Sequence, residues 1–483
     1  MTDDQELGVT ESKAHNIGEW YAEVVQKSGM IDYSGMSGFM ILNPWGHSVW
    51  EEIRNAVDGW FQETGVENAY YPLFIPESQF EQEKNIVEGF DPEVAWVTHG
   101  GRRELEERLA VRPTSESVIT PHLGTKIRSY RDLPKRVNQW CSVVRWEATE
   151  TKPFLRTREF LWQEGHGAFA TEADAWEDTM LRLQQYVDLY EDVLALPALT
   201  GRKPEHDKFP GAEVTTTVET LMPDGKSIQG ATPHYLGTTF AEEYGITFTD
   251  ENETEQTAHT TSWGSTWRTI GAVIMAHGDD QGLVLPPTVA PKQVVIVPIW
   301  TEDNREAVLE YAESLYDDLE DDFRVRLDDR DHRNPGFKFN EWELKGVPLR
   351  IEVGSNELEE GTATLVHRPD GEDALEERDE IAETVDEHLD SIYGKLYDAA
   401  SEYMDERITE ADSREEILGT IGRQGGYVKA GWCGDEACEE PIKDAISAEI
   451  VMVDLDADAE PIQDTCAICG DAATETAYFA KSH

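Results

Sequence analysis

The sequence predicts an α/β chain in three parts: an α+β domain built on an antiparallel sheet, a small α/β domain and a cysteine-bearing tail. Short strands of the Val143–Trp146 kind alternate with helical segments up to about residue 286. The proline-rich segment Leu285–Pro291 is typical of a linker. A chain of 483 residues is long enough for about three domains. We therefore expect domains at 1–286, 292–395 and 396–483.

Apolar residues three or four positions apart predict two core-facing helices near the N-terminus. These residues are Trp20, Tyr21, Val24 and Val25 in the first helix, and Trp50, Ile53, Val57, Trp60 and Phe61 in the second. Gly65 follows the second run, and a glycine at this place is a common helix end.

After the linker, short apolar runs alternate with an amphipathic segment, which predicts a small sheet packed against a helix. The expected strands are Val294–Val297, Phe323–Leu327, Leu349–Val353 and Ala363–Val366, and the helix surrounds Val308–Tyr316. Residues 371–417 are acidic and are expected to be helical. The run Val294–Trp300 has the length of a strand and is too short to cross a membrane.

The net charge indicates the medium in which the chain works. Its 41 basic and 98 acidic residues give a formal charge of −57. Self-repulsion of that size destabilises a compact chain in dilute buffer. In molar salt the screening length shrinks to about 3 Å, and most of the repulsion disappears. The composition favours a halophilic protein, with an acidic mesophilic one as the alternative. Residues 1–13 are polar and lack the apolar core of a signal peptide, so we expect a cytoplasmic location.

Four of the five cysteines form two close pairs in the tail. Cys433 and Cys438 are spaced C-x4-C, and Cys466 and Cys469 are spaced C-x2-C. Four thiolates suit a closed, tetrahedral, structural zinc site. The alternatives are disulfides, which a reducing cytoplasm disfavours, or cysteines without partners. The tail has little apolar sequence of its own, so we expect its order to depend on the metal.

Residues 144–166 carry the most informative motif. Arg145 and Glu147 stand two apart, so in a strand they would project from one face. The turn-like segment 148–153 would then fold back a second arm that carries Arg156, Arg158 and Phe160, and would bring Arg156 and Phe160 over the same face. Arginine can hold an anionic phosphate or carboxylate, glutamate can accept from an adenine amino group, and phenylalanine can stack on a base. The motif favours a nucleotide site; an exposed hairpin with cross-strand ion pairs is the alternative.

Two other segments support that interpretation. Thr114 and Glu116 stand two apart after a proline, although the same pattern is typical of a helix start. Gly264 precedes Arg268, which opens the apolar, helix-like run Ile270–Met275. An arginine at the foot of a buried helix suits a polyphosphate, and an arginine paired with a structural carboxylate is the alternative.

Together these segments closely resemble the class II prolyl-tRNA synthetases of the archaeal and eukaryotic type. Tyr70–Pro76 is similar to motif 1, the Arg145–Phe160 hairpin to motif 2, and Trp263–Arg268 with its helix to motif 3. The pieces similar to the proline enzymes in particular are Pro113–Glu116, Phe160–His166, Ile228–His234 and Gly336–Gly354. The resemblance covers nearly the whole chain, and it implies a class II catalytic domain, an α/β anticodon-binding domain and a small zinc-binding C-terminal domain.

The resemblance also implies roles for individual residues. Catalytic contacts to the reacting anions would come from Arg145 and Arg268. ATP would be held by Arg145, Glu147, Arg156, Arg158, Phe160, Gln229, Thr232, Ser265 and Arg268. Proline would be held by Thr114, Glu116, Arg145, Phe90, Trp162, His166 and His234. Zinc would take Cys433, Cys438, Cys466 and Cys469, and Mg²⁺ would accompany the phosphates of ATP.

The implied partners are proline, ATP and tRNA(Pro), with a homodimer through motif 1 and no membrane. Glu343 and Arg350 are candidate anticodon readers. Because the acidic chain lacks a general basic footprint, RNA contacts would depend on local clusters such as Arg330, Arg333 and Lys338, for which a solvated loop is the alternative.

Some features depart from the family pattern or bear on rival functions. Arg145 and Arg268 lie only 123 positions apart, which leaves no room for an editing insertion between them. The sequence ends in His483 where many relatives end in tyrosine, and Asn356 stands near the usual place of a basic residue.

The rivals are another class II synthetase, such as the threonine enzyme, and a non-catalytic RNA-binding paralogue.

Overall fold

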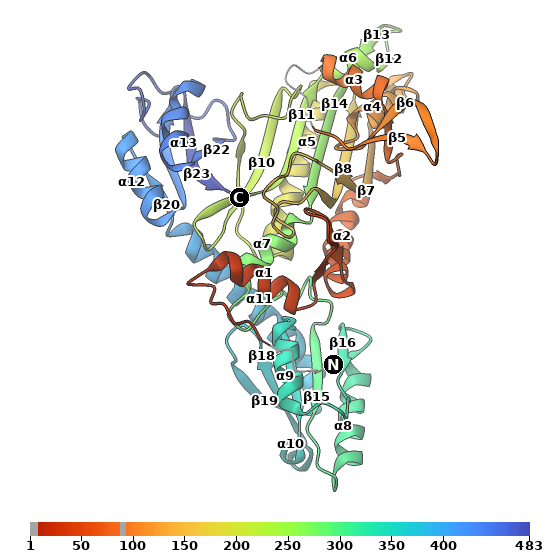
Figure 1. Cartoon of the computed structure of the whole chain (residues 1–483), viewed down its shortest axis with the longest axis vertical. Helices are drawn as coiled ribbons and strands as arrows, with labels where there is room; N and C mark the ends of the chain where they lie inside the picture. Colours follow the sequence, from red (N-terminus) through yellow and green to blue (C-terminus); the bar gives the residue numbers. More distant parts are fainter. Residues whose placement is uncertain (1–7, 87–92) are drawn as a thin grey trace.

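The structure, a computed structural model, describes residues 8–86 and 93–483. Its largest sheet has eleven strands in the order β20-β21-β23-β22-β9-β10-β11-β14-β8-β7-β3 (Figure 1). The middle strands are β7 (Lys135–Val144), β8 (Glu159–Phe169), β9 (Leu199–Arg202), β10 (Val214–Leu221), β11 (Lys226–Gly237) and β14 (His259–Thr266). Neighbours among these six strands pair antiparallel. The predicted antiparallel sheet is therefore confirmed.

Both predicted N-terminal helices are present, as α1 (Ile17–Lys27) and α2 (Pro44–Glu63). The apolar residues that predicted α1 are all fully buried. Helices α1, α2 and α7 (Arg268–His277) contribute to one large hydrophobic core. Helix α5 (Glu172–Asp188) packs against the middle strands and continues into a π-helical turn, Leu189–Val193. The apolar spacing of α1 and α2 thus correctly identified the helices that cover this sheet.

Smaller elements surround the sheet. They are β1 (Ile31–Tyr33), β2 (Met40–Leu42), β4 (Phe74–Pro76), α3 (Glu77–Ile86), β5 (Trp96–Gly100), β6 (Arg103–Val111), α4 (Glu116–Gly124), α6 (Thr239–Tyr244), β12 (Thr247–Thr249) and β13 (Glu255–Thr257). The edge strand β3 (Glu67–Asn68) belongs to the large sheet itself, where it pairs with β7. Helix α4 begins at Glu116, so the helix-start interpretation of the Thr114–Glu116 pattern is correct as far as local structure goes.

The second domain has a five-stranded sheet in the order β16-β15-β17-β18-β19. Its elements are β15 (Val294–Pro298), α8 (Arg305–Leu319), β16 (Val325–Leu327), α9 (Pro335–Leu344), β17 (Leu349–Val353), α10 (Ser355–Glu360), β18 (Thr362–His367), β19 (Asp373–Glu377) and α11 (Ile381–Asp405). The expectation that all of 371–417 is helical is wrong, because β19 and β20 (Ile408–Glu410) lie within it. The side chains of β19 alternate between partly buried and exposed, a strand pattern that its acidic composition hid.

The C-terminal part contains β20, α12 (Arg414–Gln424), β21 (Tyr427–Trp432), α13 (Glu440–Ile446), β22 (Glu449–Val453) and β23 (Glu475–Ser482). It has a hydrophobic cluster of its own, so the expectation of a tail with little apolar core is wrong. Strand β23 also pairs with β11, which makes the sheet continuous with that of the first domain. In Figure 1 the strands of this part (blue) form one edge of the large sheet, whereas the second domain lies at the opposite end of α11. None of the described helices is long and apolar enough to cross a membrane.

Candidate active site

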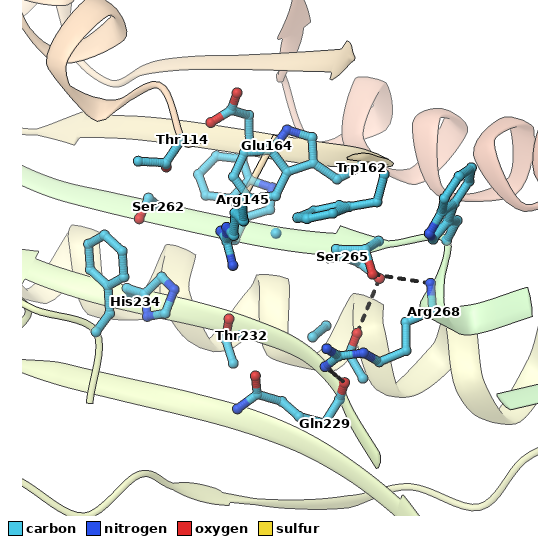
Figure 2. Close-up of a pocket in the computed structure, with 18 of the residues that line it drawn as sticks. Thr114, Arg145, Trp162, Glu164, Gln229, Thr232, His234, Ser262, Ser265 and Arg268 are labelled. Carbon is cyan, nitrogen blue, oxygen red and sulfur yellow. Dashed lines mark hydrogen bonds between the residues drawn. The ribbon is translucent and has the colours of Figure 1, made fainter. Parts of the chain in front are cut away.

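A cavity of about 420 Å³ opens on one face of the large sheet, and residues from β8, β11, β14 and the β7–β8 loop line it. Figure 2 shows that Thr114 and His234 lie at one end, and Gln229 and Arg268 at the other. Arg145 projects into the space between the two ends. A cationic group in the middle of an elongated cavity can contact two anionic ligands that meet there.

The β7–β8 hairpin has a longer loop than the sequence predicts. Strand β7 ends at Val144, so Arg145 and Glu147 lie in the loop rather than in a strand. The amide of Arg145 still donates to the carbonyl of Arg158 at 2.8 Å, which keeps the two arms together at this point. Both Arg145 and Glu147 nevertheless line the cavity, because the loop turns back towards the sheet.

The guanidinium of Arg145 is held by aromatic faces and one carbonyl. It lies 5.4 Å from the ring centre of Phe160 and 5.5 Å from that of Trp162. Its Nε donates to the carbonyl of Pro113 at 3.3 Å. Burial lowers the pKa of Arg145, and the nearby carboxylates of Glu147, Glu116 and Glu164 partly offset this effect. An arginine remains charged even so. The side chain is thus a desolvated cation with most of its N–H donors available to a ligand.

Arg268 forms the far end of the cavity at the first residue of α7. Its Nε donates to Leu155 O at 3.1 Å, and its Nη1 donates to Gln229 O at 3.2 Å. Burial lowers the pKa of Arg268, and the positive charges of Arg145 and Arg156 lower it further. Three guanidinium groups therefore share one cavity and repel one another, an arrangement that a polyanionic ligand would relieve.

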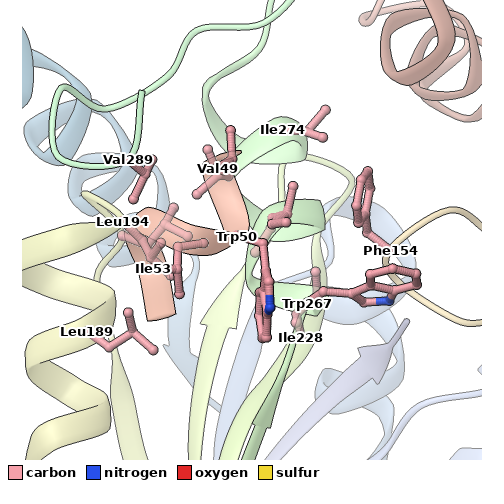
Figure 3. Close-up of a cluster of buried hydrophobic side chains, with 14 of the residues drawn as sticks. Val49, Trp50, Ile53, Phe154, Leu189, Leu194, Ile228, Trp267, Ile274 and Val289 are labelled. Atoms are coloured by element: carbon pink, nitrogen blue, oxygen red, sulfur yellow. The ribbon is translucent and has the colours of Figure 1, made fainter. Parts of the chain in front are cut away.

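The hydrophobic core fixes the start of α7. Trp267, the residue before Arg268, is buried and lies edge-on to Phe154, with ring centres 5.5 Å apart. Figure 3 shows both rings beside Ile228 and Ile274 in the core. Phe154 and Leu155 come from the β7–β8 loop, so the same packing connects that loop to the helix. Core packing thus holds two of the cavity's walls in one relative position.

Two buried carboxylates, those of Glu116 and Glu164, lie at the other end of the cavity. Thr114 Oγ1 donates to Glu116 Oε2, and both residues are at most 5% exposed. Glu164, 3% exposed, accepts hydrogen bonds from Ser115 Oγ at 2.6 Å and from Gln139 Nε2 at 2.5 Å. No role for Glu164 was predicted from the sequence. Glu164 stands two residues from both Trp162 and His166, so in a strand the three side chains share one face. That spacing could have identified Glu164 as a residue of the cavity.

Two histidines, His166 on β8 and His234 on β11, also line the cavity. His166 Nε2 lies 3.4 Å from Glu164 Oε2, and His234 Nδ1 lies 3.0 Å from Thr215 Oγ1. Burial, with a smaller effect of His166, lowers the pKa of His234 to about 3. His234 is therefore neutral near pH 7. Its ring lies 4.6 Å from that of Phe209, so it presents an uncharged wall to the cavity.

The structure brings most of the predicted site residues together. Those that line the cavity are Thr114, Glu116, Arg145, Glu147, Arg156, Phe160, Trp162, His166, Gln229, Thr232, His234, Ser265 and Arg268. Arg158 lies outside it, because its guanidinium covers Trp146 and its Nε donates to Ala148 O at 3.0 Å. Phe90 lies outside the described residues. Lys203, Asp207 and Phe209 also line the cavity. They stand in a loop without periodicity, so no sequence pattern predicted their place.

The four tail cysteines converge as their spacing predicts. Their sulfur atoms all lie within 4.8 Å of one another, with Cys433–Cys438 at 3.6 Å and Cys433–Cys469 at 3.7 Å. Thiolates bound about 2.3 Å from a tetrahedral zinc ion stand about 3.8 Å apart, so these residues fit the ion. Burial raises the pKa of Cys466, but backbone N–H donors from Cys469, Ile468 and Cys433 bring it down to about 7. The four cysteines are free thiols in the structure.

Two members of the basic cluster expected to contact RNA, Arg330 and Lys338, belong to an ion-pair network around Asp328 instead. Arg330 donates to Asp328 at 2.6 Å and to Glu341 at 2.7 Å, and Lys338 is only 1% exposed. Neither the solvated loop nor a free basic patch describes Arg330 and Lys338. Burial of Asp328 explains the difference, because a buried carboxylate needs cationic partners.

The two candidate anticodon readers lie together at a second cavity of about 1110 Å³ between the first two domains. Glu343 Oε1 accepts from Arg350 Nη1 at 2.9 Å. Lys13, Asp279 and Arg368 line the same cavity.

Comparison with known proteins identifies all three parts. The family described as tRNA synthetase class II core domain (G, H, P, S and T) matches residues 96–277. The family described as anticodon binding domain matches residues 293–388, and the one described as prolyl-tRNA synthetase, C-terminal, matches 414–483.

Full-length relatives agree with these matches. The proline--tRNA ligase of Natronomonas pharaonis is 67% identical over 99% of this chain and 100% of its own. That of Ruminiclostridium cellulolyticum is 48% identical over 97% of both chains. The crystal structure of prolyl-tRNA synthetase from Cryptosporidium parvum, complexed with halofuginone and AMPPNP, matches with a TM-score of 0.92 at 40% identity. It covers 99% of this chain and 100% of its own. With a cavity of the expected composition and likeness along its whole length, the chain belongs to the class II prolyl-tRNA synthetases, the proline--tRNA ligases.

Proposed function

We propose that the described cavity performs both steps of proline attachment, with the residues named below. In the first step a carboxylate oxygen of proline attacks the α-phosphorus of ATP, and pyrophosphate leaves. In the second step a terminal hydroxyl of tRNA attacks the prolyl carbonyl, and AMP leaves. Both reactions need positioning and neutralisation of charge more than a strong general base. The observation that carries the proposal is the place of Arg145, midway between the two ends of the cavity.

Arg145 would contact both the proline carboxylate and the α-phosphate. Two anions repel as they approach, and a desolvated guanidinium between them reduces that repulsion where the transition state forms. Arg156 and Arg268 would hold the outer phosphates. Arg268 lies at the end of the cavity opposite Thr114, and Arg156 lines the same cavity and is close enough to lower the pKa of Arg268. Mg²⁺ would accompany the phosphates as their usual counter-ion.

The adenine would lie against Phe160 near Glu147, with Gln229, Thr232 and Ser265 along the floor. Arg158 is a weaker candidate, because it would have to leave Trp146 to reach ATP.

Proline would occupy the opposite end. Its charged secondary amine would pair with Glu116 and Thr114, which already hydrogen-bond each other. Trp162, His166 and His234 would enclose the five-membered ring. Glu164 would hold this end in place through Ser115, the residue between Thr114 and Glu116. A neutral His234 suits an apolar ring, since a charged imidazole would have to be desolvated.

For tRNA(Pro), we propose that the second domain reads the anticodon with Glu343 and Arg350, which border the interdomain cavity.

We propose one structural zinc ion on the four cysteines, which stabilises the C-terminal part. Domain limits of 1–286, 292–405 and 406–483 fit better than a break at 395, because α11 runs unbroken from Ile381 to Asp405. Similar proline--tRNA ligases occur in Natronomonas pharaonis and Haloarcula marismortui, which supports a halophilic protein. We propose that it acts in the cytoplasm.

A homodimer is supported by exposed apolar residues in the motif 1 segment. Tyr70 is 73% exposed, Phe74 is 42% exposed and Leu73 is 36% exposed. Large apolar side chains gathered in one exposed segment are typical of an interface. Light scattering in molar KCl should give the mass of two chains, and Tyr70→Asp should shift it towards one.

Proline-dependent exchange of pyrophosphate into ATP in molar KCl tests the central proposal. Exchange should require proline and should not be supported by threonine. A chain that binds tRNA(Pro) but catalyses no exchange with any amino acid would be the non-catalytic paralogue, and exchange with threonine alone would make it the threonine enzyme.

A further inference from the structure

The loop that joins β9 to β10, residues 203–213, separates the cavity from the C-terminal domain. On its inner side Lys203, Asp207 and Phe209 line the cavity. Phe209 lies against His234, with ring centres 4.6 Å apart, and its amide donates to Thr215 Oγ1 at 2.9 Å. Displacement of this loop would therefore move one wall of the end proposed to hold proline.

The outer side of the same loop contacts the C-terminal domain. His206 Nε2 lies 2.5 Å from Glu439 Oε2. The His206 ring also lies edge-on to Trp432, with ring centres 6.5 Å apart. Glu439 is 5% exposed and accepts from the amide of Ile450 at 2.9 Å, so it belongs to the core of that domain. Because Glu439 is itself held in the core of the C-terminal domain, it fixes the position of His206.

The base of the loop has a second connection. Arg202, directly before the loop, pairs with Glu475 of β23 at 2.8 Å and donates to Asp454 O at 3.0 Å. Both partners belong to the C-terminal domain. The loop is thus attached to the C-terminal domain at its base as well as at His206.

A buried relay makes the third connection. Tyr427 OH and Ser227 Oγ are 2.8 Å apart, and Ser227 Oγ donates to Glu219 Oε2 at 2.6 Å. Glu219 Oε1 lies 3.4 Å from Lys203 Nζ. Tyr427, Ser227 and Glu219 are at most 1% exposed. Because a buried carboxylate that loses a donor is costly, this relay favours one position of Lys203.

We propose that the C-terminal domain positions the proline-side wall of the cavity, and that His206 is the positioning residue through which it holds loop 203–213. His206 touches neither proline nor ATP in this scheme. Its contact selects the loop position in which Phe209 covers His234. The scheme rests on the proposed placement of proline beside His234.

The test uses the full chain in molar KCl, with kcat and both KM values measured by proline-dependent exchange. His206→Ala should raise the KM for proline about tenfold, as expected for loss of a charge-assisted contact, and change the KM for ATP by less than about twofold. His206→Gln, which retains a donor for Glu439, should restore most of the affinity. Glu205→Ala is the matched control, because Glu205 is exposed and pairs with Lys208 within the loop.

Hydrogen exchange of a peptide covering 203–213 provides a readout independent of catalysis. His206→Ala should lower its protection, whereas Glu205→Ala should not. If wild-type protein shows no proline-dependent exchange, the proposed function fails, but the hydrogen-exchange comparison still tests the contact. Unchanged protection in His206→Ala, or an equal rise in both KM values, would overturn the proposal.

Tyr427→Phe supplies an independent variant if His206→Ala does not fold. It removes one hydroxyl from the relay and keeps the ring in place. The KM for proline should rise about threefold, with the KM for ATP unchanged. A wild-type KM for proline in Tyr427→Phe would exclude a role for the relay.

Discussion

Arg368 of the anticodon-binding domain holds Asp279 of the catalytic domain through two hydrogen bonds of 2.7 Å, one to each carboxylate oxygen. Arg368 directly follows β18, and Asp279 stands two residues beyond the end of α7. Helix α7 begins at Arg268 in the active-site cavity. One helix thus connects the end of the cavity proposed to hold ATP to the domain proposed to read the anticodon.

Arg368→Ala should lower the free energy of unfolding by about 1–3 kcal/mol, because Arg368 is nearly fully buried and its loss leaves Asp279 without its partner. Arg368→Lys should recover only part, since an ammonium cannot form the two parallel bonds. Urea denaturation in molar KCl measures both. Arg378→Ala is the control, because Arg378 pairs with the half-exposed Asp318 inside one domain and should cost less than about 1 kcal/mol. Equal losses in Arg368→Ala and Arg378→Ala would contradict a special role for the interdomain pair.

Arg145→Ala should reduce proline-dependent pyrophosphate exchange by at least about 10²–10³-fold, since no other side chain lies between the two reacting anions in the proposed arrangement. Circular dichroism should match the wild type. Arg54→Ala controls for loss of a cation, because Arg54 is exposed on α2 and contacts Trp140 outside the cavity. Near-normal exchange in Arg145→Ala would refute the role given to this residue.

Trp162→Ala should weaken proline binding far more than ATP binding. The indole is 8% exposed and donates to Cys141 Sγ at 3.3 Å, which fixes its ring in the wall of the cavity proposed to enclose proline. Loss of a buried aromatic side chain removes about 3 kcal/mol or more of packing, and here the lost contacts belong to one ligand. Titration calorimetry with each ligand separates the two affinities. Equal loss of both would indicate general unfolding.

Metal analysis of protein purified in molar KCl should give about one zinc per chain, as a four-thiolate site requires. Chelation should make the cysteine segments 433–438 and 466–469 sensitive to protease, while the large sheet stays folded. Trp432 and Glu439 flank the first cysteine pair and contact His206. We therefore expect chelation to raise the KM for proline as well, which a fully separate tail would not do. A metal-free preparation with protease-resistant cysteine segments would contradict the zinc assignment.

His277 should make stability fall as pH falls. Burial lowers its pKa to about 4, despite its hydrogen bond to the carbonyl of Leu194. Between about pH 6.5 and pH 4 the unfolded chain binds a proton that the folded chain excludes, so the free energy of unfolding decreases by up to about 1.4 kcal/mol per pH unit. Urea midpoints at pH 7 and pH 5.5 should differ less in His277→Gln than in the wild type. An equal difference between the two pH values in His277→Gln and in the wild type would contradict this role for His277.

Local sequence was sufficient for the parts of the site that lie close together along the chain. Trp162 and His166 alternate along β8, and Arg268 opens an apolar helix, so their spacing placed them correctly. The two cysteine pairs likewise converge as expected. Local sequence was not sufficient for Arg158. Its guanidinium covers Trp146 instead of lining the cavity, because strand alternation does not extend into the β7–β8 loop.

The sequence by itself determined the antiparallel sheet, the main helices, the family and most of the cavity residues, because each depends on local periodicity or on a contiguous motif. Only the tertiary structure decided that β23 extends the catalytic sheet, that Glu164 is buried beside Ser115, and that loop 203–213 contacts the C-terminal domain. The paired residues in these contacts lie between 49 and 255 positions apart. Such contacts form when distant surfaces pack and buried polar groups find partners, and no local pattern records which partner that will be.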